Sequence, residues 1–147
     1  MTSPSPESEP CPVARSLDVI GDRWSLLIVR DAMDGVRRFS DFQRSLGVAR
    51  NILSDRLRKL VDAGVLALQS ASDGTTYQEY VLTAAGEQLF PVVVALRQWG
   101  EQHRFAPGER HSRLIDRATG KPVARMQPRR SDGRVLALGG TFVKKVG

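Results

Sequence analysis

Two short amphipathic helical patterns, separated by only a few residues around Gly47, constrain the fold of this sequence more than any other feature. The first pattern covers residues 40–46. The second starts at Ala49 or Arg50 and ends at Ala63. Two helices joined by so short a glycine-containing turn form the helix-turn-helix connection, so the sequence predicts that motif here.

Each of the two helices is expected to have a buried and an exposed face. Ser40 can cap the first helix, whose Phe42 and Leu46 point inward. Gly64 is a stop signal for the second helix. The inward stripe of that second helix consists of Leu53, Leu57, Leu60 and Val61.

A β-hairpin is expected directly after the two helices. Strand-like runs cover Val65–Gln69 and Tyr77–Leu82, and Ser72, Asp73 and Gly74 between them form a turn signal. A hairpin in this position is the wing of a winged helix-turn-helix. The predicted fold class is therefore mainly α with a β-hairpin wing.

Three further helices are expected around this motif. Pro12–Ile20 and Trp24–Met33 precede it, and a long helix from Ala84 to about Arg104 follows the hairpin, capped by Thr83. Pro91 lies inside the long helix, where it should kink the helix or cost a backbone hydrogen bond.

The composition divides the chain into three predicted parts. Residues 1–10 are rich in Ser, Pro and Glu and are expected to be a disordered arm. Residues 11–104 are the predicted winged helix-turn-helix domain. Residues 105–147 have short apolar runs between glycines and prolines and are expected to form a small β-rich extension.

The net charge of +6 is unevenly distributed along the chain. Residues 37–60 carry seven basic and two acidic residues, a net charge of +5, and residues 104–147 carry a net charge of +8. The two remaining segments, 1–36 and 61–103, are acidic. A basic segment over the helix-turn-helix favours nucleic acid as the partner.

The second helix of the motif is the one that enters the major groove and presents its polar face to base edges. Its candidate DNA-binding residues are Arg50, Asn51, Ser54, Asp55, Arg58 and Lys59. Arg suits guanine, Asn suits adenine, and Ser tolerates different bases. Three arginines before the turn, Arg37, Arg38 and Arg44, are placed to meet phosphates.

A solvated amphipathic helix is the competing interpretation, because charged residues on a wet helix face usually bind nothing. The helix-turn-helix spacing, the wing and the local charge of +5 together favour DNA binding.

Several other functional classes find no support in the sequence. The single cysteine, Cys11, forms neither an internal disulfide nor a zinc site, and it suits a reducing compartment. The longest apolar stretch, residues 90–96, is far too short to span a bilayer, and residues 1–10 hold no signal-peptide core. We recognise no nucleophile with its base, no phosphate loop and no metal-ligand cluster, so we predict no enzyme, metal or cofactor.

Four sequence runs in this order resemble the HxlR-type winged helix-turn-helix regulators. They are CPVARSLDVIGDRWSLLIVRDAMDG, RRFSDFQRSLG, RNILSDRLRKLVDAG and EYVLTAAG, which together cover roughly residues 11–103. Two positions depart from the family pattern. Ala49 stands where the family often has a helix-capping Ser, and the wing tip lacks the basic residue that many winged proteins have.

The resemblance implies a cytoplasmic bacterial transcription factor that acts as a homodimer on duplex DNA. Its dimer would be built by the segments Cys11–Ile20 and Ala84–Arg104, with two recognition helices about 34 Å apart over a pseudo-palindromic operator. Some family members sense oxidants, quinones or other electrophiles through a cysteine at the position of Cys11.

Two interpretations of Cys11 remain open. A helix N-terminus and the nearby Arg15 favour a reactive thiolate, so the cysteine could sense an oxidant or another small effector. The alternative is an inert cysteine packed at the dimer interface.

The leading hypothesis is a regulator that represses by occupying its operator. The alternative is a winged module that binds protein or RNA without operator specificity.

Overall fold

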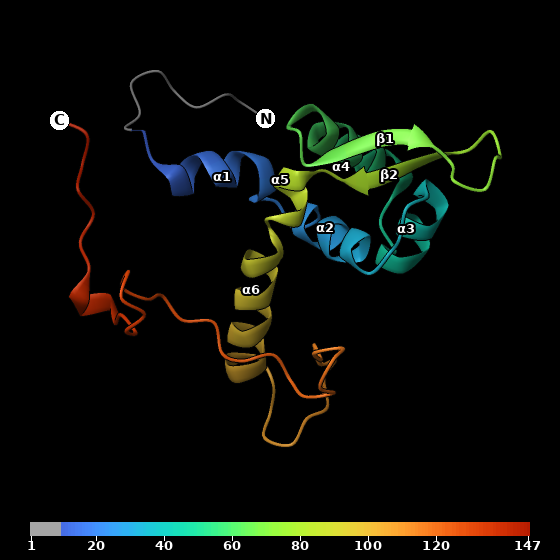
Figure 1. Cartoon of the computed structure of the whole chain (residues 1–147). Coiled ribbons are helices and arrows are strands. Elements are labelled where there is room, and N and C mark those ends of the chain that lie inside the picture. The colour runs from blue at the N-terminus through green and yellow to red at the C-terminus, as the bar shows by residue number, and fades with distance from the viewer. Residues whose placement is uncertain (1–9) are drawn as a thin grey trace. The chain divides into compact units, whose positions relative to one another are not determined.

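The computed structural model describes residues 10–147 (Figure 1). Apart from Pro10, the predicted arm at residues 1–10 lies outside the described residues. The chain divides into two compact units, one ending at Phe90 and the other beginning at Pro91. The elements in chain order are α1 (Pro12–Ile20), α2 (Ser25–Met33), α3 (Phe39–Leu46), α4 (Arg50–Asp62), β1 (Leu66–Ser70), β2 (Gln78–Leu82), α5 (Ala84–Glu87), α6 (Phe90–His103) and the short 3-10 helix η1 (Leu138–Gly140).

The first unit is a winged helix-turn-helix, as the sequence predicts. β1 and β2 pair antiparallel with Leu66 opposite Leu82 and Ser70 opposite Gln78, and they form the hairpin labelled in Figure 1. Helices α2, α3 and α4 pack on one another, and α4 also packs on β1. The predicted fold class is confirmed for this part of the chain.

The core of the first unit joins these helices to the hairpin. Ile28 from α2, Phe42 from α3 and Leu53 from α4 are fully buried, and Leu66 from β1 is almost so. Tyr80 of β2 meets the Phe42 ring edge to face, with 6.4 Å between ring centroids. This packing fixes α3 and α4 relative to the wing.

Two glycines set the ends of the helices in the helix-turn-helix. Gly47 ends α3 with a φ of +63°, which allows the turn into α4. Gly64 follows α4 with a φ of +79°, and the Val65 N–H donates to the Leu60 carbonyl at 2.9 Å. Both stops agree with the sequence prediction.

The predicted Ser40 cap of α3 is wrong. Arg38 has the extended backbone of the capping position, so α3 begins at Phe39 and Ser40 lies within its first turn. The Arg38 side chain makes no capping hydrogen bond, but the Asp41 carboxylate lies in the first turn, where it suits the helix dipole.

The predicted long helix is divided into α5 and α6. Pro91 has no N–H to donate to the carbonyl of Glu87, and its ring would clash with that carbonyl. Helix α5 therefore ends at Glu87, and α6 begins at Phe90. The predicted Thr83 cap is confirmed, since its hydroxyl accepts the Gly86 N–H at 3.1 Å.

The predicted β-rich extension is also wrong. The described residues 105–147 contain two isolated bridges, Ile115 with Pro122 and Arg129 with Val135, and no β-strand. The glycine turns do form, with Gly120 donating to the Asp116 carbonyl at 2.8 Å. The apolar runs on either side are too short to extend a ladder, and Pro122 lacks the N–H that a ladder needs.

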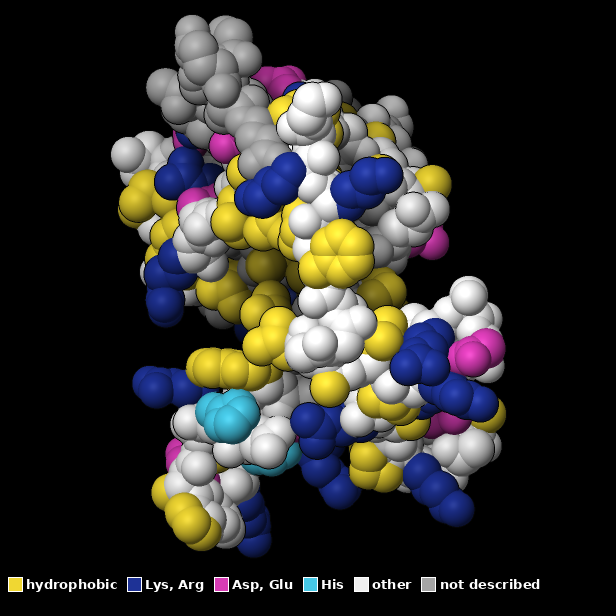
Figure 2. All heavy atoms as spheres, turned by 90° about the vertical axis from the view of Figure 1, so that its left-hand side faces the viewer, with side chains coloured by type: hydrophobic (Ala, Val, Ile, Leu, Met, Phe, Trp, Pro, Cys, Tyr) yellow, Lys and Arg dark blue, Asp and Glu magenta, His cyan; other side chains and the backbone are white. Residues whose placement is uncertain are grey.

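Hydrophobic side chains lie at the surface of both units, beside Lys and Arg side chains (Figure 2). Val13 and Leu17 on α1 are 66% and 57% exposed, and on α6 Leu96 and Trp99 are 52% and 59% exposed. Within the described residues, no helix is long and apolar enough to cross a membrane.

Candidate nucleic-acid interface

Helix α4 presents a polar face opposite its buried leucines. Leu53, Leu57 and Leu60 anchor one side in the core. Arg50, Asn51, Ser54 and Arg58 are exposed on the remaining surface, and Asp55 and Lys59 are half-buried beside them. The predicted reading residues therefore share one helix that the core holds in place.

Three residues in the N-terminal half of α4 make few or no polar contacts with the rest of the described chain. Asn51 and Ser54 make no side-chain hydrogen bond to any residue that the structure describes. The Arg50 guanidinium lies over the ring of Phe39, 5.0 Å from its centroid, and has no carboxylate partner among the described residues. These side chains are available to an outside partner.

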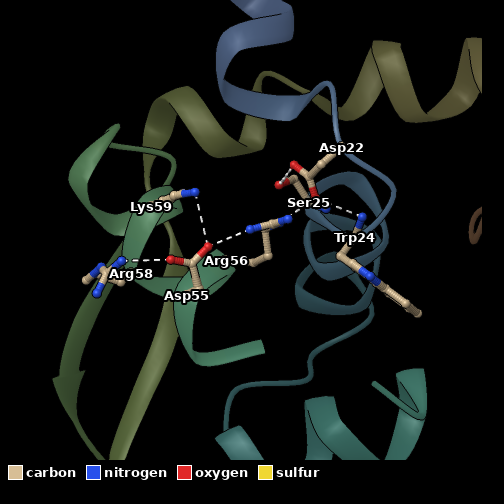
Figure 3. Close-up of polar contacts among 7 residues, drawn as sticks. All are labelled: Asp22, Trp24, Ser25, Asp55, Arg56, Arg58 and Lys59. Atoms are coloured by element: carbon tan, nitrogen blue, oxygen red, sulfur yellow. Dashed lines mark hydrogen bonds and ion pairs between the residues drawn. The ribbon is translucent and has the colours of Figure 1, made fainter. Parts of the chain in front are cut away.

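Asp55 is surrounded by three cations of its own helix. Its carboxylate pairs with Arg56, with Arg58 at 2.7 Å and with Lys59 at 3.1 Å, and Figure 3 shows all three pointing toward it. The hydrogen bond from Lys59, together with the charges of Lys59, Arg56 and Arg58, lowers the pKa of Asp55 despite some desolvation. Asp55 therefore orients three of the cations of α4, and both of its oxygens accept from them.

Arg56 is a site residue that the sequence interpretation missed. Its Nε donates to Asp22 Oδ2 at 2.9 Å, so that Arg56 lies between Asp22 and Asp55 (Figure 3). Position 56 lies three residues after Leu53 and four before Leu60, beside the buried stripe. That spacing was a signal that Arg56 faces the protein and not the solvent.

Asp22 in turn holds the start of α2. Its Oδ2 accepts the backbone N–H groups of Trp24 at 2.9 Å and Ser25 at 3.0 Å, and its other oxygen accepts the Ser25 hydroxyl. Partial burial raises the pKa of Asp22, but the bonds from Ser25, Trp24 and Arg56 more than offset this and lower the pKa. The carboxylate thus couples the α1–α2 junction to α4.

The three arginines before the turn each meet a carboxylate. Arg37 Nη1 lies 3.8 Å from Glu79, and Arg44 Nη1 lies 3.2 Å from Asp41. Arg38 pairs with Asp73 at the tip of the hairpin. Arg37 and Arg44 are exposed and Arg38 is half-buried.

Cys11 occupies the position before the first turn of α1. It is half-buried, and its backbone carbonyl accepts the Arg15 N–H at 3.0 Å. Its side chain makes no capping hydrogen bond to α1. Within the described residues, no group of three or more His, Cys, Asp or Glu side chains could hold a metal ion.

The comparisons with known proteins agree with this geometry. A family model described as HxlR-like helix-turn-helix matches residues 19–106. An uncharacterised HTH-type transcriptional regulator of Mycobacterium tuberculosis is 46% identical over 95 residues, which are 65% of this chain and 60% of that protein. The chain thus spans less than two thirds of that relative. The HTH-type transcriptional regulator YybR of Bacillus subtilis is 34% identical over 100 residues, covering 67% of this chain and 80% of YybR.

Two solved structures of regulators also resemble this chain. The crystal structure of PA1607, described as a transcription factor, has a TM-score of 0.88 and 56% sequence identity, and covers 92% of this chain and 94% of that one. The structure of the oxidised form of the redox regulator HypR has a TM-score of 0.59 and 33% sequence identity. It covers 65% of this chain and 100% of the HypR chain.

Proposed function

This chain belongs to the HxlR-like helix-turn-helix family of transcriptional regulators, which are not enzymes, and from that premise we propose that it binds a specific duplex DNA operator and represses transcription by occupying it. The observation that carries the proposal is the exposed face of α4. Among the described residues, Arg50, Asn51 and Ser54 have few or no partners there, and buried leucines on the opposite side hold the helix. Such a protein acts in the bacterial cytoplasm, where its operator lies.

The reading residues take different roles in this proposal. Arg50 and Asn51, at the N-terminal end of α4, contact base edges, as residues at that end of a recognition helix do. Ser54 and Arg58 continue the same face one turn further. Asp55 holds Arg58 and Lys59 in position, and Arg37 and Arg44 contact phosphates.

DNA selection with the purified protein, followed by footprinting on the promoters next to its gene, tests this function. We expect a dissociation constant of about 10⁻⁸ M or lower at physiological salt.

Asn51→Ala should cost about 1–3 kcal/mol on the selected operator and little on random duplex, because one base contact is lost. Arg44→Ala should weaken binding to both by a similar factor. Failure to select or protect any duplex would contradict the proposal, and selective binding of RNA or protein would support the alternative winged module.

We propose that the protein acts as a homodimer through α1 and α6. Each helix carries exposed apolar side chains, Val13 and Leu17 on α1 and Leu96 and Trp99 on α6. Exposed apolar side chains of this kind on separate helices are typical of an interface between subunits. The dimer would present two copies of α4 to a pseudo-palindrome with half-sites about 34 Å apart.

We propose that Cys11 makes the regulator responsive to oxidants or electrophiles. A single cysteine per chain can react in two ways: it forms an adduct, or two Cys11 thiols form an intersubunit disulfide while the oxidant takes up two electrons and two protons. The likeness to the redox regulator HypR supports the proposal. In the DNA-binding assay, diamide should release the operator from the wild type and leave Cys11→Ser bound. If diamide releases the operator from both the wild type and Cys11→Ser, Cys11 is not the sensor and has a packing role.

A further inference from the structure

We propose that the wing contacts the DNA backbone through a cation taken from outside the wing: Arg38 of the α2–α3 loop, held at the hairpin tip by Asp73 and Tyr77. The inference rests on the proposed function, because it describes how part of the same DNA-binding surface is built.

The hairpin has no cation of its own. From Leu66 to Leu82 the sequence contains no Lys or Arg, and residues 72–78, around the tip, are exposed. A wing that contacts phosphate needs a positive charge or several donors. The nearest basic residues in the sequence are Lys59 on one side and Arg97 on the other, outside the hairpin.

Arg38 supplies the missing charge through three contacts at the tip. Its Nη2 pairs with Asp73 Oδ2 and lies 3.5 Å from the Thr75 hydroxyl. Its guanidinium also lies over the Tyr77 ring, 5.0 Å from the centroid. The Arg38 side chain is 30% exposed, compared with 78% for Arg44, so it is held against the hairpin and keeps part of its surface open to solvent.

The backbone fixes the same arrangement. The Tyr80 N–H of β2 donates to the Arg37 carbonyl at 2.8 Å, which ties the loop to the edge of the hairpin. Glu79 is buried, pairs with Arg37 and accepts the Ser72 N–H at 3.0 Å. The residue before Arg38 is therefore bound to the wing at two points, and Arg38 moves with the wing.

Asp73 both orients and masks this cation. Its Oδ1 accepts the Thr75 N–H at 3.0 Å, which fixes the carboxylate in the turn. The bonds from the Thr75 backbone and hydroxyl, with a contribution from Arg38, hold the pKa of Asp73 below its ordinary value, so it is charged at neutral pH. A phosphate must compete with this carboxylate for the guanidinium. The wing therefore adds little to binding unless α4 has already docked on a matching site.

The salt dependence of DNA binding tests the proposal in the full-length protein. Arg38→Ala should reduce the slope of log K against log salt on the selected operator by about one, because one phosphate contact is lost. Asp73→Asn keeps an oxygen for the Thr75 N–H but removes the charge. It should raise affinity for random duplex by roughly twofold to fivefold, the range expected for one exposed ion pair.

The double variant Arg38→Ala with Asp73→Asn distinguishes an effect of Asp73 through Arg38 from direct repulsion of DNA by the Asp73 charge. If Asp73 acts through Arg38, Asp73→Asn should have little effect in the Arg38→Ala background. An equal gain in both backgrounds would mean that Asp73 only repels DNA by its own charge, and this would overturn the proposal. Asp62→Asn is the matched control, an exposed carboxylate of the same unit with no ion pair among the described residues, and should leave random-duplex affinity unchanged.

Failure of this inference differs from failure of the proposed function. A wild-type protein that binds its operator, with an unchanged slope in Arg38→Ala, overturns the wing contact alone. A wild-type protein that binds no duplex overturns both. Circular dichroism and urea unfolding check each variant, and Arg38→Gln, which keeps the side-chain stem, replaces Arg38→Ala if that variant does not fold.

Discussion

Asp22 joins two helices through one carboxylate. It receives the N–H groups at the start of α2 and the guanidinium of Arg56 from α4, 34 residues away in the sequence. Its side chain is 29% exposed, so solvent screens the ion pair only in part. The carboxylate acts as the cap that α2 otherwise lacks, since Trp24 at the capping position makes no side-chain bond.

Asp22→Asn should lower the free energy of unfolding by about 1–2 kcal/mol at pH 7, because a neutral amide still caps α2 but no longer pairs with Arg56. Urea unfolding measures the difference. Asp18→Asn, a neighbouring half-buried carboxylate on α1, is the control and should have a much smaller effect.

The effect of Asp22→Asn should also depend on pH. The folded protein lowers the pKa of Asp22, so the contribution of its charge is complete above the unfolded-state pKa of about 3.9 and is lost as the pH falls through the lower folded-state pKa. The difference between wild type and Asp22→Asn should thus stay constant from neutral pH to about pH 5 and shrink below about pH 4. A difference that grows on acidification would contradict this assignment.

At the scale of elements, the joint between the hairpin and α5 depends on one glycine. The Val65 carbonyl accepts the Thr83 N–H and the Thr83 hydroxyl, each at 3.1 Å. A Cβ on Gly86 would lie 2.2 Å from that carbonyl oxygen and 3.0 Å from Leu82 Cδ2. The Val65 carbonyl oxygen is a backbone atom that accepts both Thr83 hydrogen bonds. It therefore cannot move away from the new Cβ without disturbing the Thr83 cap of α5.

Gly86→Ala should therefore destabilise the protein by about 1–3 kcal/mol, the usual cost of overpacking. Gly100→Ala is the matched control, since a Cβ there meets nothing within 4 Å. It should be neutral or stabilise α6 by up to about 1 kcal/mol, the helix propensity gained. Thermal unfolding of both variants checks the contrast, and equal effects would argue against the close contact at Gly86.

The sequence predicted most of the elements of the first unit because their signals are local. Helix α1 begins at Pro12 and ends at Ile20. Gly47 and Gly64 adopt the positive φ that glycine allows and stand after α3 and α4. The errors arose where local signals conflict. At Pro91 the apolar periodicity continues through a residue that breaks the helix, and after residue 104 turn glycines suggested strands that their short apolar runs cannot form.

The electrostatics of the candidate site were much less predictable than its helix. The periodicity of α4 places Asn51 and Arg58 on its exposed face from sequence alone. The carboxylate that meets Arg38 lies 35 residues away, and that partnership depends on how the wing folds back. Charge counting over residues 37–60 gives +5 but does not reveal which cations are already paired.

At the scale of the whole molecule, the exposed apolar side chains of α1 and α6 determine the expected assembly. Leu17→Glu should convert the proposed dimer to a monomer in sedimentation experiments and weaken operator binding, because a charge cannot be buried in an apolar interface. Leu68→Glu on β1, at a leucine that is 45% exposed, should leave the oligomeric state unchanged. A wild-type protein that sediments as a monomer would contradict the dimer itself.

The link from Asp22 to Arg56 limits how the proposed operator preference could be redesigned. Helix α4 cannot be transplanted between relatives as a complete cassette, because a graft without Arg56 leaves Asp22 half-buried with no cation. A chimera should therefore exchange only the outward positions 50, 51, 54 and 58 and keep the recipient's residues at 53, 56, 57 and 60. The face of α4 that we propose contacts DNA and the face that holds the helix in the core can then be varied independently.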